Sequence, residues 1–224
     1  MSTPDTLPTV ILVSGRGSNL QAILQAAAAP SSPLEVRAVI SNRPDAPALA
    51  VARAAGIPTQ TVDHTTYPDR QHFDAALQTA IDCHAPALVV LAGFMRILGP
   101  EFVNHYRGRM LNIHPSLLPA YPGLDTHRRV LMDGVQEHGA SVHFVTPAVD
   151  GGPVVLQARV PVLPDDTVTT LAARVLEQEH CIYPQALRWF AEGRLRLAGA
   201  PPHEYALLDD KPVGTEPVAR TQGL

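Results

Sequence analysis

The sequence predicts an α/β fold built on one mixed sheet, with a parallel first half and an antiparallel hairpin in the second half. Short apolar runs alternate with helical segments over the first half of the 224-residue chain, which is typical of parallel strands joined by helices. Further along, two apolar runs flank a turn-rich loop near residue 150, which is typical of a hairpin. We therefore expect helices on both faces of a single sheet.

In the first half, each predicted strand is a run rich in Val, Ile and Leu without polar alternation, as expected when both faces of a sheet are buried. The predicted strands are 9–14, 34–41, 58–62 and 87–92, and the predicted helices are 19–29, 46–55 and 69–84. Pro30 and Gly56 are placed to end two of these helices.

In the second half, the predicted elements are a helix at 99–105, a strand at 109–113, an irregular loop at 114–125, a helix at 126–137, strands at 140–146 and 154–162, and a helix at 167–192. The sequence from about 200 is rich in Pro, Gly and charge, which predicts a loosely ordered tail. We expect one domain over 1–197, with halves at about 9–92 and 93–197, and a tail over 198–224.

Composition excludes several classes of protein. Hydrophobic residues make up 46% of the chain and charged residues 17%, which excludes disorder for most of it. A formal net charge of −4 argues against a nucleic-acid partner. The only cysteines, Cys83 and Cys181, form no CxxC or Cys/His pattern, so no metal site is expected. No signal peptide or membrane-spanning run is predicted, and we expect a cytoplasmic protein.

The segment Ser14-Gly15-Arg16-Gly17-Ser18-Asn19-Leu20 lies between a predicted strand and a predicted helix. Glycines allow a tight turn, and the free N–H groups of the first helical turn suit a phosphate. The segment is neither a Walker loop nor a G-x-G-x-x-G pattern. It predicts a phosphate loop, with an ordinary capped turn as the alternative.

Asn112 and His114 emerge on the same side of a predicted strand, at its end. An amide donor beside an imidazole is the pair that acyl transfer needs, because one stabilises an oxyanion and the other donates a proton. Asp150 lies in a loop beside two glycines and could hold the imidazole in its charged form. The alternatives are a structural histidine and a routine Asp-Gly turn.

The run Gly93-Phe94-Met95-Arg96-Ile97-Leu98 follows a buried strand. Apolar side chains with one arginine at the carboxyl end of a strand could line a pocket for a flat heterocycle. A buried strand–helix corner is equally compatible with this run.

Taken in order, these segments resemble the glycinamide ribonucleotide formyltransferases, within the wider group of folate-dependent formyltransferases and hydrolases. The similar stretches are GRGSNLQAIL, VVLAGFMRILGPEFV, LNIHPSLLPAYPGL, EHGASVHFVTPAVDGGPV and QEHCIYP, which lie between about 9 and about 197. The resemblance implies a Rossmann-like formyltransferase fold and transfer of a formyl group from 10-formyltetrahydrofolate to the amine of 5-phosphoribosylglycinamide, in purine biosynthesis. It implies small-molecule substrates, no metal, no nucleic-acid or membrane partner, and a monomer or weak homodimer.

The resemblance also implies roles for individual residues. The catalytic set is Asn112, His114 and Asp150, and the phosphate and ribose of the substrate would be held by Gly17, Ser18, Asn19 and Glu179. The folate contacts would be Arg70, Met95, Arg96, Ile97, Leu98, Asn112, Thr146, Pro147, Ala148, Val149 and Asp150. His127 and His143 would support the site. Asp125 departs from some relatives, which carry another polar residue there such as histidine.

Three alternatives stay open. A 10-formyltetrahydrofolate hydrolase shares the Asn/His/Asp set, but its relatives carry an N-terminal domain for which we expect no counterpart before the first strand. Methionyl-tRNA formyltransferases have an added C-terminal domain, and neither the length nor the charge of this chain favours one. A non-catalytic nucleotide- or folate-binding protein would not need all three catalytic residues.

Overall fold

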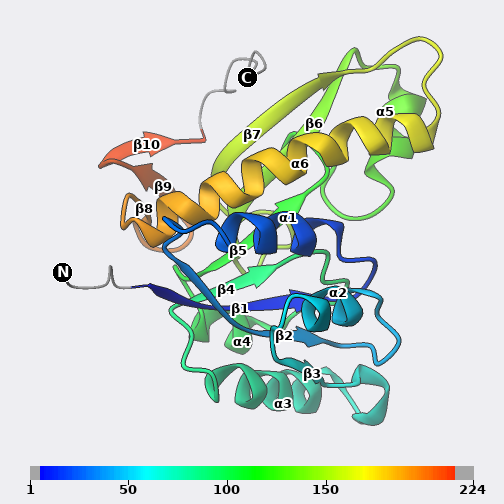
Figure 1. Ribbon diagram of the computed structural model, residues 1–224. Helices are drawn as coiled ribbons and strands as arrows, with labels where there is room; N and C mark the ends of the chain where they lie inside the picture. The colour runs from blue at the N-terminus through cyan, green and yellow to red at the C-terminus, as the bar shows by residue number, and fades with distance from the viewer. Residues whose placement is uncertain (1–5, 215–224) are drawn as a thin grey trace.

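The computed structural model describes residues 6–214 and contains a seven-stranded mixed sheet in the order β3-β2-β1-β4-β5-β6-β7 (Figure 1). The strands are β1 (Leu7–Val13), β2 (Leu34–Ser41), β3 (Thr59–Thr61), β4 (Leu88–Leu91), β5 (Met110–His114), β6 (Glu137–Phe144) and β7 (Val154–Pro161). Strands β1 to β5 pair in parallel, whereas β6 pairs antiparallel with both β5 and β7. The predicted parallel half and hairpin are therefore confirmed.

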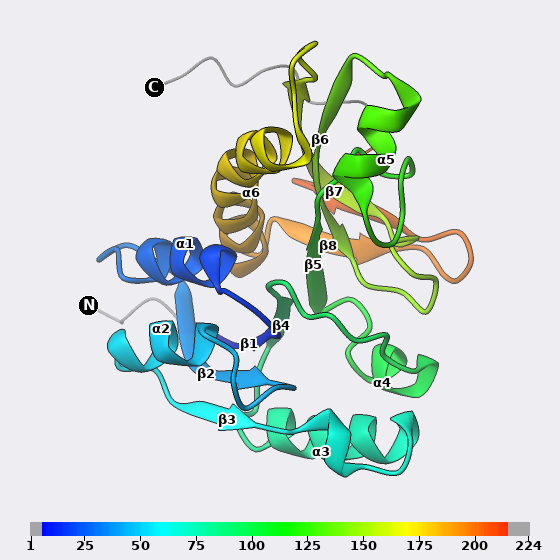
Figure 2. The same ribbon diagram turned by 90° about the vertical axis from the view of Figure 1, so that its right-hand side faces the viewer.

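Helices cover both faces of the sheet, with α1 and α6 on one side and α3 and α4 on the other (Figure 2). The helices are α1 (Ser18–Ala27), α2 (Ala48–Ala54), α3 (Arg70–Asp82), α4 (Pro100–His105), α5 (Thr126–Asp133) and α6 (Val168–Ala191). No helix among residues 6–214 combines the length and apolar character needed to cross a bilayer.

Strand β1 shows why the first apolar run has no polar alternation. Ile11 and Val13 belong to the core cluster that contains residues of α1 and α6, whereas Val10 and Leu12 belong to the cluster that contains residues of α3 and α4. Successive side chains of a strand point to opposite faces, so a strand buried on both faces must be apolar throughout.

The strand order reverses between β1 and β4. The chain proceeds from β1 to β2 and β3 on one side, and then crosses back to add β4 and β5 on the other side. Ligands of open α/β sheets bind beside such a reversal, at the carboxyl ends of the strands. The segments that follow β1, β4 and β5 therefore face the same edge.

The C-terminal segment differs from the predicted loose tail. Strands β8 (Leu195–Ala198), β9 (Tyr205–Leu208) and β10 (Lys211–Val213) form a second, antiparallel sheet. Leu195 and Ala206 are buried in the main core, and Asp209 and Asp210 form the hairpin turn with positive φ. The strands of this segment are only three or four residues long and are separated by Pro, Gly and charged residues, which masked them in the sequence. The rest of the predicted tail, 215–224, lies outside the described residues.

Helix α5 is also shorter than predicted. It ends at Asp133 rather than at residue 137, because Gly134 adopts a left-handed conformation with φ 63° and closes the helix. Strand β6 then begins at Glu137, earlier than the predicted strand.

Candidate active site

His114 lies at the end of β5 between two hydrogen-bond acceptors. Its Nε2 lies 2.9 Å from the carbonyl oxygen of Tyr121, and its Nδ1 lies 3.4 Å from Oδ2 of Asp150. Because a backbone carbonyl only accepts, Nε2 carries the hydrogen in the contact with Tyr121, and Nδ1 is the ring nitrogen that faces the Asp150 carboxylate. His114 is 6% exposed, so these two contacts define the surroundings of the imidazole. The arrangement places an imidazole beside a carboxylate, which is a pair suited to acid–base chemistry.

Asn112 lies opposite His143 in the pairing of β5 with β6, and its Nδ2 donates to Nε2 of His143 at 3.0 Å. The other ring nitrogen of His143 donates to the carbonyl of Phe144 at 2.9 Å. Burial lowers the pKa of His143 to about 4, which keeps the ring neutral and able to accept. His143 thus fixes the orientation of the Asn112 amide, whose second N–H is left for a ligand.

Asp150 lies in the loop between β6 and β7 with φ 51°, a left-handed conformation. The N–H of Gly123 donates to its Oδ2 at 2.8 Å, which positions the carboxylate beside His114. Gly152 follows where no side chain fits, because a Cβ would overlap the carbonyl oxygen of Phe144. The Asp-Gly-Gly motif is therefore more than a routine turn here.

The loop between β1 and α1 is shaped by Gly17. Its φ is 85°, and a Cβ at this position would lie 2.8 Å from Cβ of Ala48 in α2. No side chain caps the N-terminus of α1 at this residue. The first amides of α1, starting at Ser18, are thus available to an anion, as the phosphate-loop interpretation requires.

Asn19 turns inward rather than toward an anion. Its Nδ2 donates to Oε2 of Glu179 in α6 at 2.6 Å, while its Oδ1 is buried without a partner among the described residues. Burial raises the pKa of Glu179, and the bond from Asn19 partly offsets this rise. Asn19, predicted to hold the phosphate, is therefore in direct contact with Glu179, predicted to meet the ribose, although the two are separated by 160 positions.

A cavity of about 590 Å³ runs along this edge of the sheet. It joins the loop before α1, the segment after β4 and the residues on either side of His114. Its lining includes Gly17, Ser18, Asn19, Glu179, Met95, Arg96, Ile113, Pro115 and His127. It also includes Ser14 and Arg16 of the predicted phosphate loop, and three residues to which sequence analysis gave no role, Asn42, Arg43 and His64. The last three follow β2 and β3, so the rule that ligands lie at carboxyl ends of strands could have indicated them.

The segment after β4 presents large apolar side chains to the outside. Met95 is 70% exposed and Ile97 is 62% exposed, whereas Leu98 is buried. The guanidinium of Arg96 lies 5.8 Å from the centre of the Phe73 ring. Exposed apolar side chains beside a cation suit a flat ligand that carries negative charge.

Arg70, at the start of α3, lies beside the end of the same segment. Its Nε lies 3.9 Å from where a Cβ on Gly99 would be. The Gly99 N–H donates to Oδ2 of Asp74 at 2.7 Å, and both Arg70 and Arg96 act electrostatically on this carboxylate. Arg70 therefore lies near the predicted folate residues after β4, although it is distant from them in sequence.

The loop before Asp150 contains the remaining predicted folate residues, Thr146, Pro147, Ala148 and Val149. Gly151 donates through its N–H to the carbonyl of Ala148 at 3.1 Å, which closes the turn. Val149 is 54% exposed and offers an apolar surface next to Asp150.

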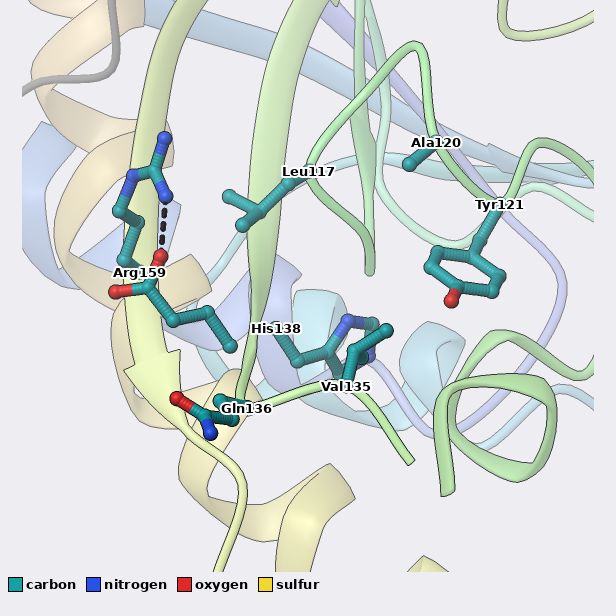
Figure 3. A pocket seen from close by; sticks show the side chains of 8 residues that line it. Leu117, Ala120, Tyr121, Val135, Gln136, His138 and Arg159 are labelled. Carbon is teal, nitrogen blue, oxygen red and sulfur yellow. Dashed lines mark hydrogen bonds and ion pairs between the residues drawn. The ribbon is translucent and has the colours of Figure 1, made fainter. Parts of the chain in front are cut away.

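His127 lines the 590 Å³ cavity and contacts a second buried histidine, His138. Its Nδ1 lies 3.0 Å from Nε2 of His138, and burial lowers the pKa of both rings, that of His138 to about 4. His138 lines a second cavity of about 530 Å³ with Leu117, Ala120, Tyr121, Val135, Gln136, Glu137 and Arg159 (Figure 3). The histidine pair thus lies between the two cavities, with one ring on each.

Comparison with known proteins decides the family. A family model described as formyl transferase matches residues 8–187. The phosphoribosylglycinamide formyltransferase of Escherichia coli is 56% identical over 188 residues, which cover 84% of this chain and 89% of that protein. The chain belongs to the phosphoribosylglycinamide formyltransferase family. A relative in humans, the trifunctional purine biosynthetic protein adenosine-3, is 45% identical over 84% of this chain and 18% of that longer protein.

Solved structures of the family have the same fold. The phosphoribosylglycinamide formyltransferase of Coxiella burnetii superposes with a TM-score of 0.87 at 52% identity, covering 93% of this chain and 96% of that one. The glycinamide ribonucleotide transformylase 1 of Symbiobacterium toebii gives a TM-score of 0.85 at 48% identity, covering 88% and 93%. The family resemblance and the fold class expected from the sequence are therefore confirmed.

Proposed function

We propose that this protein transfers the formyl group of 10-formyltetrahydrofolate to the amine of 5-phosphoribosylglycinamide, giving the N-formyl product and tetrahydrofolate in purine biosynthesis. The observation that carries the proposal is the continuity of the 590 Å³ cavity, which joins the phosphate loop and the segment after β4 to Ile113 and Pro115, the two neighbours of His114 in the sequence. Family membership supports the same activity, since the relatives carry this name.

The phosphorylated substrate would bind at the β1 side of the cavity. The amides at the start of α1 and the guanidinium of Arg16 would hold the phosphate. Arg43 lines the same side of the cavity, with its guanidinium paired to Asp45 at 2.9 Å. Glu179 would accept a hydrogen bond from a ribose hydroxyl, because its buried carboxylate has only Asn19 as a partner among the described residues. Asn19 is proposed to act through Glu179 and through its own backbone N–H.

The folate would lie at the β4 side, where the residues present fit it. Met95, Ile97 and Val149 offer exposed apolar contacts for the ring system, and Arg70 and Arg96 supply charge for its carboxylates. The remaining predicted contacts, Leu98 and 146–148, would support these side chains rather than supply charge. The folate brings an electrophilic formyl carbon to the site.

The chemistry proposed for the catalytic residues follows from their contacts. His114, protonated on both nitrogens, and the second N–H of Asn112 would stabilise the negative charge that develops on the formyl oxygen. Asp150 would keep His114 charged through the 3.4 Å contact. Oδ2 of Asp150 is engaged by Gly123 and His114, so Oδ1 would accept the amine proton, directly or through water.

The test is a folate absorbance assay of the purified protein with 10-formyltetrahydrofolate, run with and without 5-phosphoribosylglycinamide. We expect deformylation only when the amine is present. Equal deformylation without the amine would instead identify a hydrolase. Binding of both ligands without turnover would identify a non-catalytic binder.

Further properties belong to the same proposal. We propose that residues 1–197 form the catalytic unit, since all the cavity-lining residues lie within it. We expect no nucleic-acid partner, because the chain carries a formal net charge of −4. A monomer or weak homodimer without a membrane partner is part of the same proposal. A cytoplasmic location agrees with Cys83 and Cys181, which are free thiols.

A further inference from the structure

Ser14 lies where the strand order reverses between β1 and β4, with its hydroxyl turned inward. It directly follows β1 and is 5% exposed. Ser14 lines the cavity, and it lies between two segments of larger exposure, the loop at Gly15 and the segment at Met95. It is therefore a buried polar residue shared by both sides of the proposed substrate site.

The hydrogen bonds of Ser14 tie three strand ends together. Its N–H donates to the carbonyl of Gly93 at 3.1 Å, and its Oγ accepts from the N–H of Met95 at 2.7 Å. The hydroxyl hydrogen is given to Oδ1 of Asn42 at 2.5 Å. One hydroxyl therefore acts as donor and acceptor at once, which is its full capacity apart from one lone pair.

Asn42 extends the connection to a further residue of the cavity wall. Asn42 is 2% exposed, and its carbonyl oxygen lies 2.8 Å from Nδ1 of His64. The side-chain Nδ2 of Asn42 also lies 3.3 Å from Nδ1 of His64, so the tautomer of His64 decides which of the two contacts is a hydrogen bond. The network thus runs from the segment after β4, through Ser14, to the ends of β2 and β3.

We propose that Ser14 is a positioning residue. Its hydroxyl couples the loop before α1 to the segment after β4, so that binding of one substrate raises the affinity of the protein for the other. The inference rests on the proposed function, which places the phosphate at the loop after Ser14 and the folate at the segment Gly93–Leu98. A ligand that orders one exposed loop also restrains Ser14, and through its hydrogen bonds the other loop. The second ligand then loses less conformational freedom on binding.

A second anchor of the same segment allows a matched comparison. Oδ2 of Asp74 accepts from the N–H of Gly99 at 2.7 Å, at the far end of the segment from Ser14. The charges that act on Asp74 are Arg70 and Arg96, which belong to the folate side of the site. Removing this carboxylate should loosen the folate segment without breaking the connection between the two loops.

A third position controls for the loss of a buried hydroxyl. Thr9 lies near the opposite end of β1 from Ser14, is fully buried, and donates through its hydroxyl to the carbonyl of Leu7 at 3.0 Å. Thr9→Val should leave binding of both ligands unchanged, because Thr9 does not line the cavity.

The test is calorimetric titration of tetrahydrofolate, which carries no formyl group and cannot react, with and without saturating 5-phosphoribosylglycinamide. For the unmodified protein and Thr9→Val, we expect saturating 5-phosphoribosylglycinamide to lower the Kd of tetrahydrofolate by a factor of at least about five. Ser14→Ala should reduce this factor to within about twofold of unity. Asp74→Ala should weaken folate binding in both conditions and leave the factor unchanged.

The outcomes separate the two proposals. If the unmodified protein binds neither ligand, the proposed function fails and the coupling with it. If it binds both and turns over, but shows no coupling or keeps it in Ser14→Ala, only the coupling is overturned. Should Ser14→Ala fail to fold by circular dichroism, Asn42→Ala removes the acceptor of the same hydroxyl and should lower the factor as well, and an unchanged factor would overturn the coupling.

Discussion

Asp150 Oδ2 lies 3.4 Å from Nδ1 of His114, and this contact joins a hairpin loop to the end of a strand that precedes it by 36 positions in the sequence (150 − 114). The carboxylate is itself fixed by the N–H of Gly123. The pair is almost enclosed, with side chains 8% and 12% exposed. Both side chains are therefore largely shielded from solvent and from dissolved salt.

The first prediction concerns this pair in catalysis. Asp150→Asn and His114→Ala should each lower kcat by about 10²-fold or more, because each removes an acid–base or oxyanion-stabilising group. The double variant should lose little more than the worse single variant, since the pair acts as a unit. Steady-state kinetics with both substrates saturating checks this, and multiplicative losses would contradict the coupling of the two residues.

The second prediction concerns the buried carboxylate of Glu179. Its pKa is raised above 4.5 by burial, so the folded state binds this proton more tightly than the unfolded state does. The stability that this provides is present at low pH and is lost as pH rises through the raised pKa. Glu179→Gln should therefore have a higher free energy of unfolding than the unmodified protein at pH 7 but not at pH 4.5.

The same substitution should weaken function. The amide introduced by Glu179→Gln would keep the contact with Asn19 but remove the charge that accepts the ribose hydroxyl, so KM for the phosphorylated substrate should rise by about tenfold. Urea unfolding at several pH values gives the stability, and kinetics gives KM. A variant that is more stable at all pH values equally would contradict the assigned pKa direction.

The third prediction concerns His138, whose pKa is lowered to about 4 by burial. A neutral buried histidine stabilises the fold above its unfolded pKa of 6.5, and this stability is lost as pH falls from 6.5 toward 4. As pH falls from 6.5 toward 4, the free energy of unfolding should therefore decrease less for His138→Gln than for the unmodified protein. The two decreases should differ by up to about 3 kcal/mol.

Urea unfolding at about pH 7, 6, 5 and 4.5 spans this titration range and provides the comparison, with the exposed His203→Gln as the control. We expect the free energy of unfolding of the control to change with pH as that of the unmodified protein does. The difference in free energy of unfolding between the unmodified protein and His138→Gln should narrow as pH falls. Parallel curves for all three proteins would refute the role of burial at His138.

The fourth prediction concerns Gly17 in the loop before α1. At Gly17 the backbone has a positive φ of 85°, and an added Cβ would lie 2.8 Å from Cβ of Ala48. At Gly56 the φ is 74°, and an added Cβ would have no atom within 4 Å. We expect Gly56→Ala to lose about 1 kcal/mol and Gly17→Ala about 2 to 3 kcal/mol in urea unfolding. Gly17→Ala alone should also raise KM for the phosphorylated substrate. Equal stability losses would show that the contact with Ala48 relaxes at no cost.

Much of this fold and site was predictable from sequence because the signals are local. Buried strands such as β1 are continuous apolar runs, and residues such as Asn112 and His114 share a strand face. What could not be predicted depends on the packing of distant segments. Asn19 turns toward Glu179 rather than outward because α6 packs beside α1, and nothing near Asn19 signals this.

The same reasoning explains the residues that sequence analysis missed. Nothing in the sequence around Ser14 indicates the partners of its hydroxyl. Asn42 and Met95, which bind it, follow other strands and are distant from Ser14 in the sequence. The second sheet was missed because its strands are only three or four residues long and lie in a segment rich in Pro, Gly and charged residues. Leu195 and Ala206 are buried through contact with the main core.

The measurement that tests the central claim most directly follows the formyl group itself. The protein would be incubated with 10-formyltetrahydrofolate carrying a ¹³C-labelled formyl group and with 5-phosphoribosylglycinamide, and both labelled products would be quantified by mass spectrometry. The account predicts that the label appears on the amine, that little free formate forms, and that Asp150→Asn slows this transfer without redirecting it to water. Labelled formate released at the same rate with or without the amine would contradict it.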